Sequence, residues 1–118
     1  MSIICISSTG PSLDDQIDFR FGRCPYFLFI DSEKEELLEA VSNQAAQSPQ
    51  GAGVTAAQLV VNKKAEAVIT GNVGPNAYNV LGMSKVKIYS GVFDVSAKEA
   101  LSLFKEGKLK EIEGQPIP

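Results

Sequence analysis

The chain has 118 residues, of which 44% are hydrophobic, and its 14 acidic and 11 basic residues give a net charge of −3 at pH 7. This length suffices for one domain with its own core, and the lack of a basic surplus argues against nucleic-acid binding, which depends on lysine and arginine. The sequence has no histidine, so it lacks the commonest general base and all imidazole metal ligands. The absence of histidine therefore excludes Ser-His and Cys-His nucleophile pairs.

The N-terminal sequence favours an intracellular localisation. Met1 and Ser2 lead directly into the apolar run 3–6 without a charged segment, so we expect no signal peptide. The longest apolar runs are too short to span a membrane. Cys5 and Cys24 do not form the pattern of a secreted disulfide scaffold. We expect a cytoplasmic protein with reduced thiols and no membrane contact.

The first half of the chain predicts three strands. The apolar run 3–7 indicates a central strand, and the aromatic run 26–31 indicates a second. A long loop with two glycines and two prolines, residues 8–25, separates them. Residues 36–42 form a third strand in a hairpin with the second, although their leucines and glutamates leave a helix as the alternative.

The second half alternates helices and strands. Pro75 and Gly82 mark the start and end of one helix, and Ser96 with Glu99 forms a capping box for the last helix, which Gly107 ends. The predicted segments are a helix over 54–64, a strand over 65–70, the helix that begins at Pro75, a strand over 86–89 and the helix that begins after Ser96. We expect one domain over residues 1–110 and a loosely ordered tail over 111–118.

This order of elements predicts an α/β fold of three layers. Two β-α-β units require parallel strands with right-handed crossovers, whereas the first three strands can form a meander. The expected sheet is mixed, with strand order 3-2-1-4-5, an antiparallel second strand and about three helices on its faces. Four loops then meet at one edge, where ligands of open α/β sheets bind. They are residues 8–25, 43–53, 71–75 and 90–91.

Two predicted helices begin at this edge with glycine-bearing segments. A helix N-terminus has unpaired N–H groups and a partial positive charge, and glycine lets a ligand come close to the backbone. The alternative is that these glycines only make tight turns, because short glycine motifs recur by chance. The candidate binding residues in the two segments are Gly51, Gly53, Gly71, Asn72, Gly74 and Asn76.

The loop after the first strand contains the segment DFRFGRCPYF, residues 18–27. Arg20 and Arg23 flank Phe21 and Gly22, and Cys24 follows at once. Neighbouring guanidinium groups favour the thiolate, so we expect a lowered pKa for Cys24, and a thiolate is a soft ligand for iron, copper or iron–sulfur species. The alternative is a half-buried turn cysteine beside two solvated arginines. Arg20, Gly22, Arg23 and Cys24 are therefore further candidate cofactor-binding residues, with Cys24 as the candidate metal ligand.

Two other groups of residues are expected to be structural. Asp14, Asp15 and Asp18 depart from the spacing of a calcium-binding loop, so we expect them to be solvated at the surface. Cys5 lies inside a buried strand and should pack as a small hydrophobic residue.

Three segments in this order and spacing resemble the dinitrogenase iron–molybdenum cofactor-binding family: RFGRCPYFLFID, GAGVTAAQLV and AVITGNVGPNAYNVL. The resemblance extends to about Leu109. The family comprises small proteins related to the nitrogenase accessory cofactor carriers. The resemblance implies a ribonuclease H-like fold and the non-catalytic binding of a metal–sulfur cluster, with cofactor donor or acceptor proteins as partners and a monomer or weak homodimer as the state.

The sequence departs from this family at two positions. Many relatives have histidine just before the Phe-Gly-Arg or the Gly-Ala-Gly motif, where this chain has Arg20 and Gln50. Imidazole ligation is therefore not implied, and Cys24 is the soft ligand that remains. A nuclease is disfavoured because the first and fourth strands lack the carboxylates that hold two metal ions.

Three hypotheses follow for the function. The first is a carrier of an anionic metal–sulfur cofactor of the iron–molybdenum type or a related type. The second is an interaction or regulatory module without metal, which binds a partner through residues 8–25 and 43–50. The third is a binder of a phosphate-bearing metabolite that uses the same N–H groups.

Overall fold

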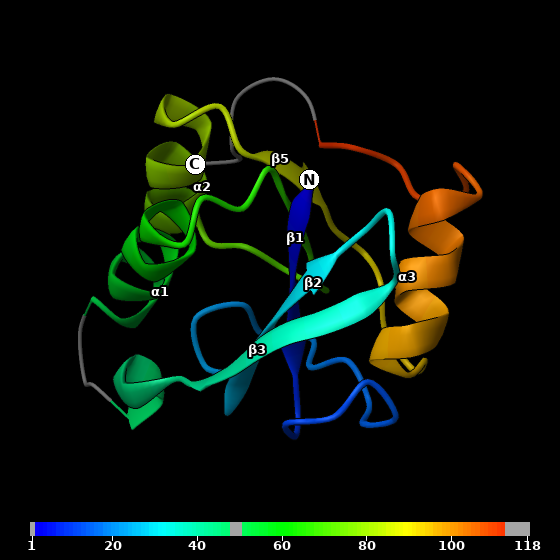
Figure 1. Ribbon diagram of the computed structural model, residues 1–118. Helices are drawn as coiled ribbons and strands as arrows, with labels where there is room; N and C mark the ends of the chain where they lie inside the picture. The colour runs from blue at the N-terminus through cyan, green and yellow to red at the C-terminus, as the bar shows by residue number, and fades with distance from the viewer. Residues whose placement is uncertain (1, 48–50, 113–118) are drawn as a thin grey trace.

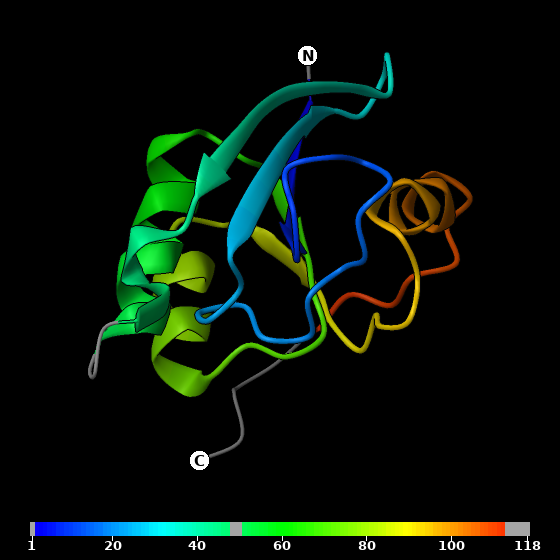
Figure 2. The same ribbon diagram turned by 90° about the horizontal axis from the view of Figure 1, so that it is seen from below.

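A mixed sheet with helices on both faces forms the molecule, as the computed structural model of residues 2–47 and 51–112 shows (Figure 1). Helices α1 and α2 cover one face of the sheet and α3 covers the other (Figure 2). In chain order the elements are β1 (Ile3–Ser8), β2 (Tyr26–Asp31), β3 (Glu36–Ser42), a 3-10 helix (Gln44–Gln47), α1 (Ala52–Asn62), β4 (Ala67–Ile69), α2 (Pro75–Met83), β5 (Lys87–Tyr89) and α3 (Ala97–Lys105).

The strand order is β3-β2-β1-β4-β5, as predicted. β1 is parallel to β4, and β4 is parallel to β5, whereas β2 is antiparallel to both of its neighbours. β3 is a strand over the predicted residues rather than a helix. Its pairing with β2 from Tyr26↔Ser42 to Asp31↔Glu36 outweighs the helix propensity of its leucines and glutamates, because propensity is a weak preference that tertiary contacts override.

Alternating side chains of the central strands fill two separate cores. Cys5, Phe27 and Phe29 face α1 and α2, whereas Ile4 and Leu28 face α3. Successive side chains of a strand point to opposite faces of the sheet. Because helices cover both faces, β1 and β2 read in sequence as continuous apolar runs rather than alternating ones.

Helix boundaries differ from the predicted ones at both ends of α1, which stops at Asn62 rather than at residue 64, and at the end of α2. α1 begins at Ala52 instead of residue 54, because Gly51 takes the left-handed conformation that leads the chain into the helix. α2 continues through Gly82 to Met83, and the left-handed residue beyond its end is Lys85, with φ 62°. The capping box of α3 is confirmed. No helix in the described part of the chain is long and apolar enough to cross a membrane.

The C-terminal segment lies along the outer edge of β5. Glu111 forms an isolated bridge with Tyr89, and the Ile112 N–H donates to the Ile88 carbonyl at 2.7 Å. These two residues, which belong to the predicted tail over 111–118, pair with backbone groups that β5 would otherwise leave unpaired. The rest of the predicted tail, 113–118, lies outside the described residues.

Candidate functional site

The carboxyl ends of β1, β3, β4 and β5 lie along one edge of the sheet, which we call the rim (Figure 2). As predicted, the unusual loops of the chain gather there. The rim consists of residues 17–25, 43–47, 51–53, 70–76 and 90–93.

A backbone bridge joins the first loop to the segment that precedes α2. The Asn72 N–H donates to the Phe19 carbonyl at 2.7 Å, and the Phe21 N–H donates to the Asn72 carbonyl at 3.1 Å, so that Arg20 lies beside Asn72. Two motifs far apart in the sequence are therefore adjacent. The same bridge corrects one expectation, because the Asn72 N–H that we expected to be available to a ligand is already paired.

The first loop also packs on the start of α1. A Cβ added at Gly22 would lie 2.9 Å from Gly53 Cα and 3.0 Å from Gly53 N, and a Cβ at Gly53 would lie 3.4 Å from Ala77 Cβ. Gly22, the first turn of α1 and the first turn of α2 thus meet within van der Waals distance. All three motifs of the predicted site come together at the rim.

Packing or backbone conformation explains why glycine occupies most of the candidate positions. A Cβ at Gly71 would lie 2.2 Å from Phe19 Cδ1, Gly22 contacts the backbone of Gly53, and Gly51 has φ 75°. For these positions the tight-turn alternative is sufficient. Gly74 differs, because its φ of −70° suits any residue and a Cβ there would meet no atom within 4 Å. Neither packing nor conformation requires glycine at this position.

The helices that begin at the two glycine motifs lack side-chain caps. The N-cap residues of α1 and α2 are Gly51 and Gly74, and neither helix has a side-chain hydrogen bond at its N-terminus. The Tyr78 N–H bonds back to the Gly74 carbonyl at 2.9 Å, which leaves the N–H groups of Asn76 and Ala77 without an intrahelical partner. α3, by contrast, has the complete capping box. The uncapped helix starts are the arrangement that binds anions.

Arg20 presents a guanidinium group to solvent at the rim. Its Nε lies 3.3 Å from Asp18 Oδ1, and its side chain is 64% exposed. The hydrogen bond from Arg20 to the Asp18 carboxylate raises the pKa of Arg20, a side chain that is always protonated in proteins. Nε and one terminal nitrogen of Arg20 each lie 3.3 Å from an oxygen of the Asp18 carboxylate, and the exposed remainder of the guanidinium is able to contact an anion.

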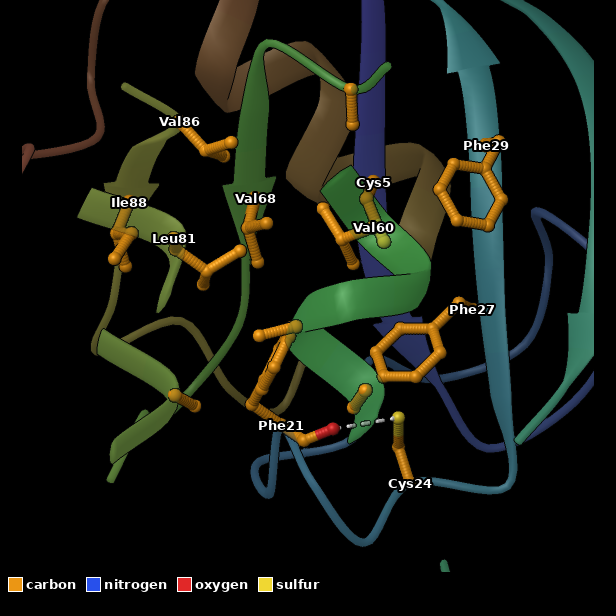
Figure 3. Close-up of a cluster of buried hydrophobic side chains, with 14 residues drawn as sticks. Cys5, Phe21, Cys24, Phe27, Phe29, Val60, Val68, Leu81, Val86 and Ile88 are labelled. Carbon is orange, nitrogen blue, oxygen red and sulfur yellow. Dashed lines mark hydrogen bonds between the residues drawn. The ribbon is translucent and has the colours of Figure 1, made fainter. Parts of the chain in front are cut away.

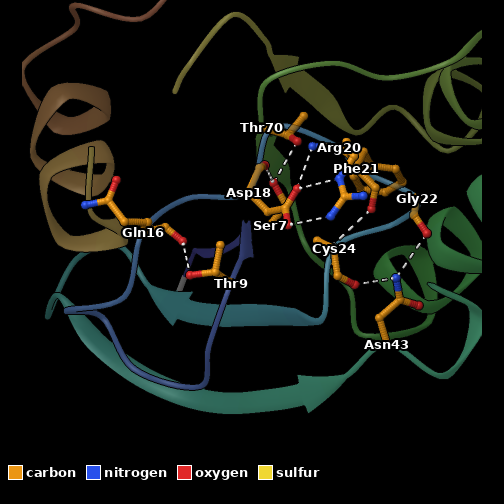
Figure 4. Close-up of polar contacts among 10 residues, drawn as sticks. All are labelled: Ser7, Thr9, Gln16, Asp18, Arg20, Phe21, Gly22, Cys24, Asn43 and Thr70. Atoms are coloured by element: carbon orange, nitrogen blue, oxygen red, sulfur yellow. Dashed lines mark hydrogen bonds and ion pairs between the residues drawn. The ribbon is translucent and has the colours of Figure 1, made fainter. Parts of the chain in front are cut away.

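Asp18 is buried rather than solvated, which corrects the expectation for this residue. Its carboxylate accepts the Arg20 N–H at 2.8 Å, its N–H donates to the Ser7 carbonyl, and its own carbonyl accepts the Ser7 hydroxyl at 2.7 Å (Figure 4). The Ser7 hydroxyl also lies 2.7 Å from Thr70 Oγ1. These bonds fasten the first loop to the ends of β1 and β4.

Asn43 is a positioning residue that the sequence analysis missed. Its side-chain amide donates to the Gly22 carbonyl at 3.1 Å and to the Cys24 carbonyl at 2.9 Å, and its oxygen accepts the Ala45 N–H (Figure 4). Arg23 donates to the Ala46 carbonyl at 2.9 Å next to this contact. The only signal in the sequence was an amide side chain directly after a strand that ends at the ligand edge.

Cys24 lies in the core beneath the rim, which contradicts the expected acidic thiol. Its sulfur points into the same cluster as Phe27, and its S–H donates to the Phe21 carbonyl at 3.2 Å (Figure 3). Burial raises the pKa of Cys24 to about 12, the Asp18 carboxylate adds to the rise, and hydrogen bonds from backbone N–H groups and the Asn43 side chain oppose it only in part. Desolvation of the thiolate decides the outcome. Cys5 is also buried, as predicted, and burial raises its pKa as well.

The described residues hold no group of three or more cysteine, aspartate and glutamate side chains that could bind a metal ion. What the rim offers instead is backbone N–H groups and a guanidinium. These groups suit an anion.

The sheet topology and the rim place the chain in the class of small three-layer α/β proteins with hydrogen-bond donors collected at the carboxyl edge of a mixed sheet. Within that class, the chain belongs to the dinitrogenase iron–molybdenum cofactor family, whose model matches residues 1–107.

Several proteins are similar to this chain over nearly their whole length. The uncharacterized protein MJ0580 of Methanocaldococcus jannaschii is 33% identical over 105 residues, which are 87% of this chain and 88% of that protein. The apo form of the orange protein from Desulfovibrio gigas is 30% identical and superimposes with a TM-score of 0.92, over 100% of this chain and 98% of that chain. The Thermotoga protein TM1290 is 35% identical with a TM-score of 0.81, over 94% and 93% of the two chains.

Alanine substitutions at two glycines of one turn should have different effects on stability. Gly71→Ala places a methyl group 2.2 Å from the Phe19 ring and 2.6 Å from its Cα, and we expect a loss of about 1–3 kcal/mol in the free energy of unfolding. Gly74→Ala enters open space, and we expect a change below about 1 kcal/mol. Urea unfolding of both variants measures the difference, and equal losses would contradict this account of the turn.

The raised pKa of Cys24 should make stability fall at alkaline pH. Below about pH 9, the ordinary pKa of the thiol, both the folded and the unfolded chain hold the proton, and the shift has no effect. Above it the unfolded chain loses the proton while the folded chain keeps it up to about pH 12. We expect the free energy of unfolding of the wild type to fall more steeply than that of Cys24→Ser, by about 1 kcal/mol per pH unit.

Urea unfolding at several pH values from about 8 to 11 measures both slopes, and Cys5, present in both proteins, cancels in the comparison. Parallel slopes would show that the folded state does not hold the Cys24 proton.

Proposed function

We propose that this protein is a non-catalytic carrier of an anionic metal–sulfur cofactor, of the iron–molybdenum type or a related type, which it binds at the rim. The observation that carries this proposal is the meeting of two uncapped helix starts, α1 and α2, beside the exposed Arg20. α3, whose N-terminus has both capping bonds, serves as the internal comparison. The family to which the chain belongs is described by the same kind of cofactor.

The cofactor is cargo in this proposal, and hydrogen bonds and charge hold it. Sulfide groups give such a cluster a negative charge, which the Asn76 and Ala77 N–H groups, the helix dipoles and the Arg20 guanidinium can balance. These contacts leave the metal–sulfur bonds intact. A cargo held in this way can be taken over by another protein, so we infer cofactor donor and acceptor proteins as partners.

Cys24 is not needed as a ligand for this mode of binding. Its pKa of about 12 keeps it a thiol near neutral pH, and its hydrogen bond to the Phe21 carbonyl turns it toward the core. Coordination by Cys24 would require the loop over residues 20–25 to open and break the two bonds from Asn43. The sequence-based assignment of Cys24 as a metal ligand is therefore the competing arrangement.

Substitutions at Gly74 should separate the α2 N–H groups from the rest of the fold. Gly74→Asp supplies a capping carboxylate that occupies these N–H groups and repels an anion, while the helix stays capped. We expect the affinity for tetrathiomolybdate, a simple thioanion, to fall more than about tenfold, because the variant loses one charge-assisted hydrogen bond to the anion. Gly74→Ser should weaken binding less, and Gly74→Ala should change it by less than about threefold.

Anaerobic titration followed by visible absorption measures these affinities, and desalting shows whether the colour stays with the protein. Wild type that binds neither tetrathiomolybdate nor a cluster assembled from iron and sulfide would overturn the proposal. Binding of inorganic phosphate with equal strength would favour a phosphate-bearing metabolite as the natural ligand.

Cys24→Ser tests the role of the thiol in the same assay. Serine keeps a hydrogen-bond donor for the Phe21 carbonyl at nearly the same volume, so the fold should persist. We expect tetrathiomolybdate affinity within about twofold of wild type, because the buried thiol makes no contact with the cargo. Loss of the bound colour from a folded Cys24→Ser protein would instead establish coordination by sulfur.

A further inference from the structure

We propose that the cargo sits over the carboxyl ends of β4 and β5, against the rings of Phe19 and Phe93, and that these rings select a sulfide-bearing anion over an oxyanion. This inference rests on the proposed carrier function and adds a position and a chemical preference to it.

The connections after β4 and β5 leave the sheet on opposite sides. β4 continues into α2 on one face, whereas β5 continues into α3 on the other (Figures 1 and 2). Adjacent parallel strands whose connections diverge leave a crevice outside their carboxyl ends, and this is where open α/β sheets bind ligands. Two hydrogen bonds join the segments that follow β4 and β5, from the Gly91 N–H to the Gly71 carbonyl at 2.7 Å and from the Val92 N–H to the Thr70 carbonyl at 3.2 Å.

Two aromatic rings stand together at this position. Phe19 is 49% exposed and Phe93 is 56% exposed. Their ring centroids lie 6.1 Å apart with the planes at 73°, an edge-to-face arrangement. The rings come from two loops far apart in the sequence, so the contact between them is a product of the tertiary structure.

The chain holds both rings at the surface through specific features of its backbone. Gly71 has no side chain where the Phe19 ring lies, and the Phe19 carbonyl accepts the Asn72 N–H. On the other side, Val92 is buried and Asp94 has φ 58°, an uncommon conformation for a residue other than glycine. Two adjacent half-exposed rings held in this way form the exposed apolar surface on which the proposal rests.

The rings suit a soft anion. Sulfur is polarizable and makes favourable contacts at the edges of aromatic rings, whereas a strongly hydrated oxyanion loses water there without gaining such a contact. Arg20 follows Phe19 directly and supplies the opposite charge, and the first turn of α2 begins just beyond Asn72. Charge attracts either kind of anion to the rim, and the rings discriminate between them.

Alanine substitutions of the two rings test this preference against two anions of equal charge. Titrations of wild type, Phe19→Ala and Phe93→Ala with tetrathiomolybdate and with molybdate give the ratio of the two affinities. We expect each substitution to weaken tetrathiomolybdate binding about fivefold or more and to change molybdate binding by less than about twofold. Leu38→Ala and Met83→Ala, which also remove exposed hydrophobic side chains but lie on β3 and at the end of α2, should leave both affinities unchanged.

A tryptophan at position 93 reports the position of the cargo directly, because the protein has no tryptophan. In Phe93→Trp, bound tetrathiomolybdate should shield the fluorescence from quenching by acrylamide, and in Met83→Trp it should not. Because this second measurement does not use Phe19→Ala, it still tests the position of the cargo if that variant unfolds.

The outcomes separate the two proposals. Wild type that fails to bind any thioanion or cluster overturns the carrier function and this inference together. If wild type binds the thioanion and neither Phe19→Ala nor Phe93→Ala changes the affinity, this inference alone is overturned. The rings would then be a contact surface for a partner protein. An equal loss of both anions would show that the rings only support the shape of the rim.

Discussion

The backbone bridge between Arg20 and Asn72 is the contact on which the arrangement of the rim depends. It fastens the long loop after β1 to the segment between β4 and α2, and the buried Asp18 carboxylate holds the same stretch from the other side. Ordering a long loop costs conformational entropy that scattered weak contacts do not offset. Through this bridge the loop acquires one conformation, in which Gly22 meets α1 and the Phe19 ring rests on Gly71.

Burial decides which groups of the rim carry charge. Arg20 and Cys24 are neighbours in the sequence, yet the guanidinium is solvated beside Asp18, whereas the thiol is enclosed with Phe21 and Phe27. Desolvation raises the pKa of a buried thiol by several units. A solvated guanidinium lowers it by less, because water screens the attraction between the two charges. The rim therefore presents positive and hydrogen-bond-donating groups, and its sulfur stays neutral inside. This division favours an anion bound from outside over a metal ion ligated from within.

Much of the fold could be predicted because local patterns encode it. A continuous apolar run identified β1 as a central strand, an aromatic run identified β2, and Ser96 with Glu99 identified the start of α3. The end of α2 was placed too early at Gly82, since glycine tolerates the helical conformation and the left-handed turn falls at Lys85 instead. For the site, the sequence located the segments that gather at the rim but missed Asn43, whose partners Gly22 and Cys24 are close only after folding.

The sequence by itself determined the strand order, the glycine-bearing helix starts at the ligand edge and the family, because each depends on residues that are near one another along the chain. Only the tertiary structure decided that packing requires Gly22 and Gly71 whereas Gly74 is free of such a need, that Cys24 is buried, and that Phe19 meets Phe93. Periodicity and capping are short-range properties, whereas burial and close approach depend on elements that the chain brings together from distant positions, and the pKa of a thiol follows that burial.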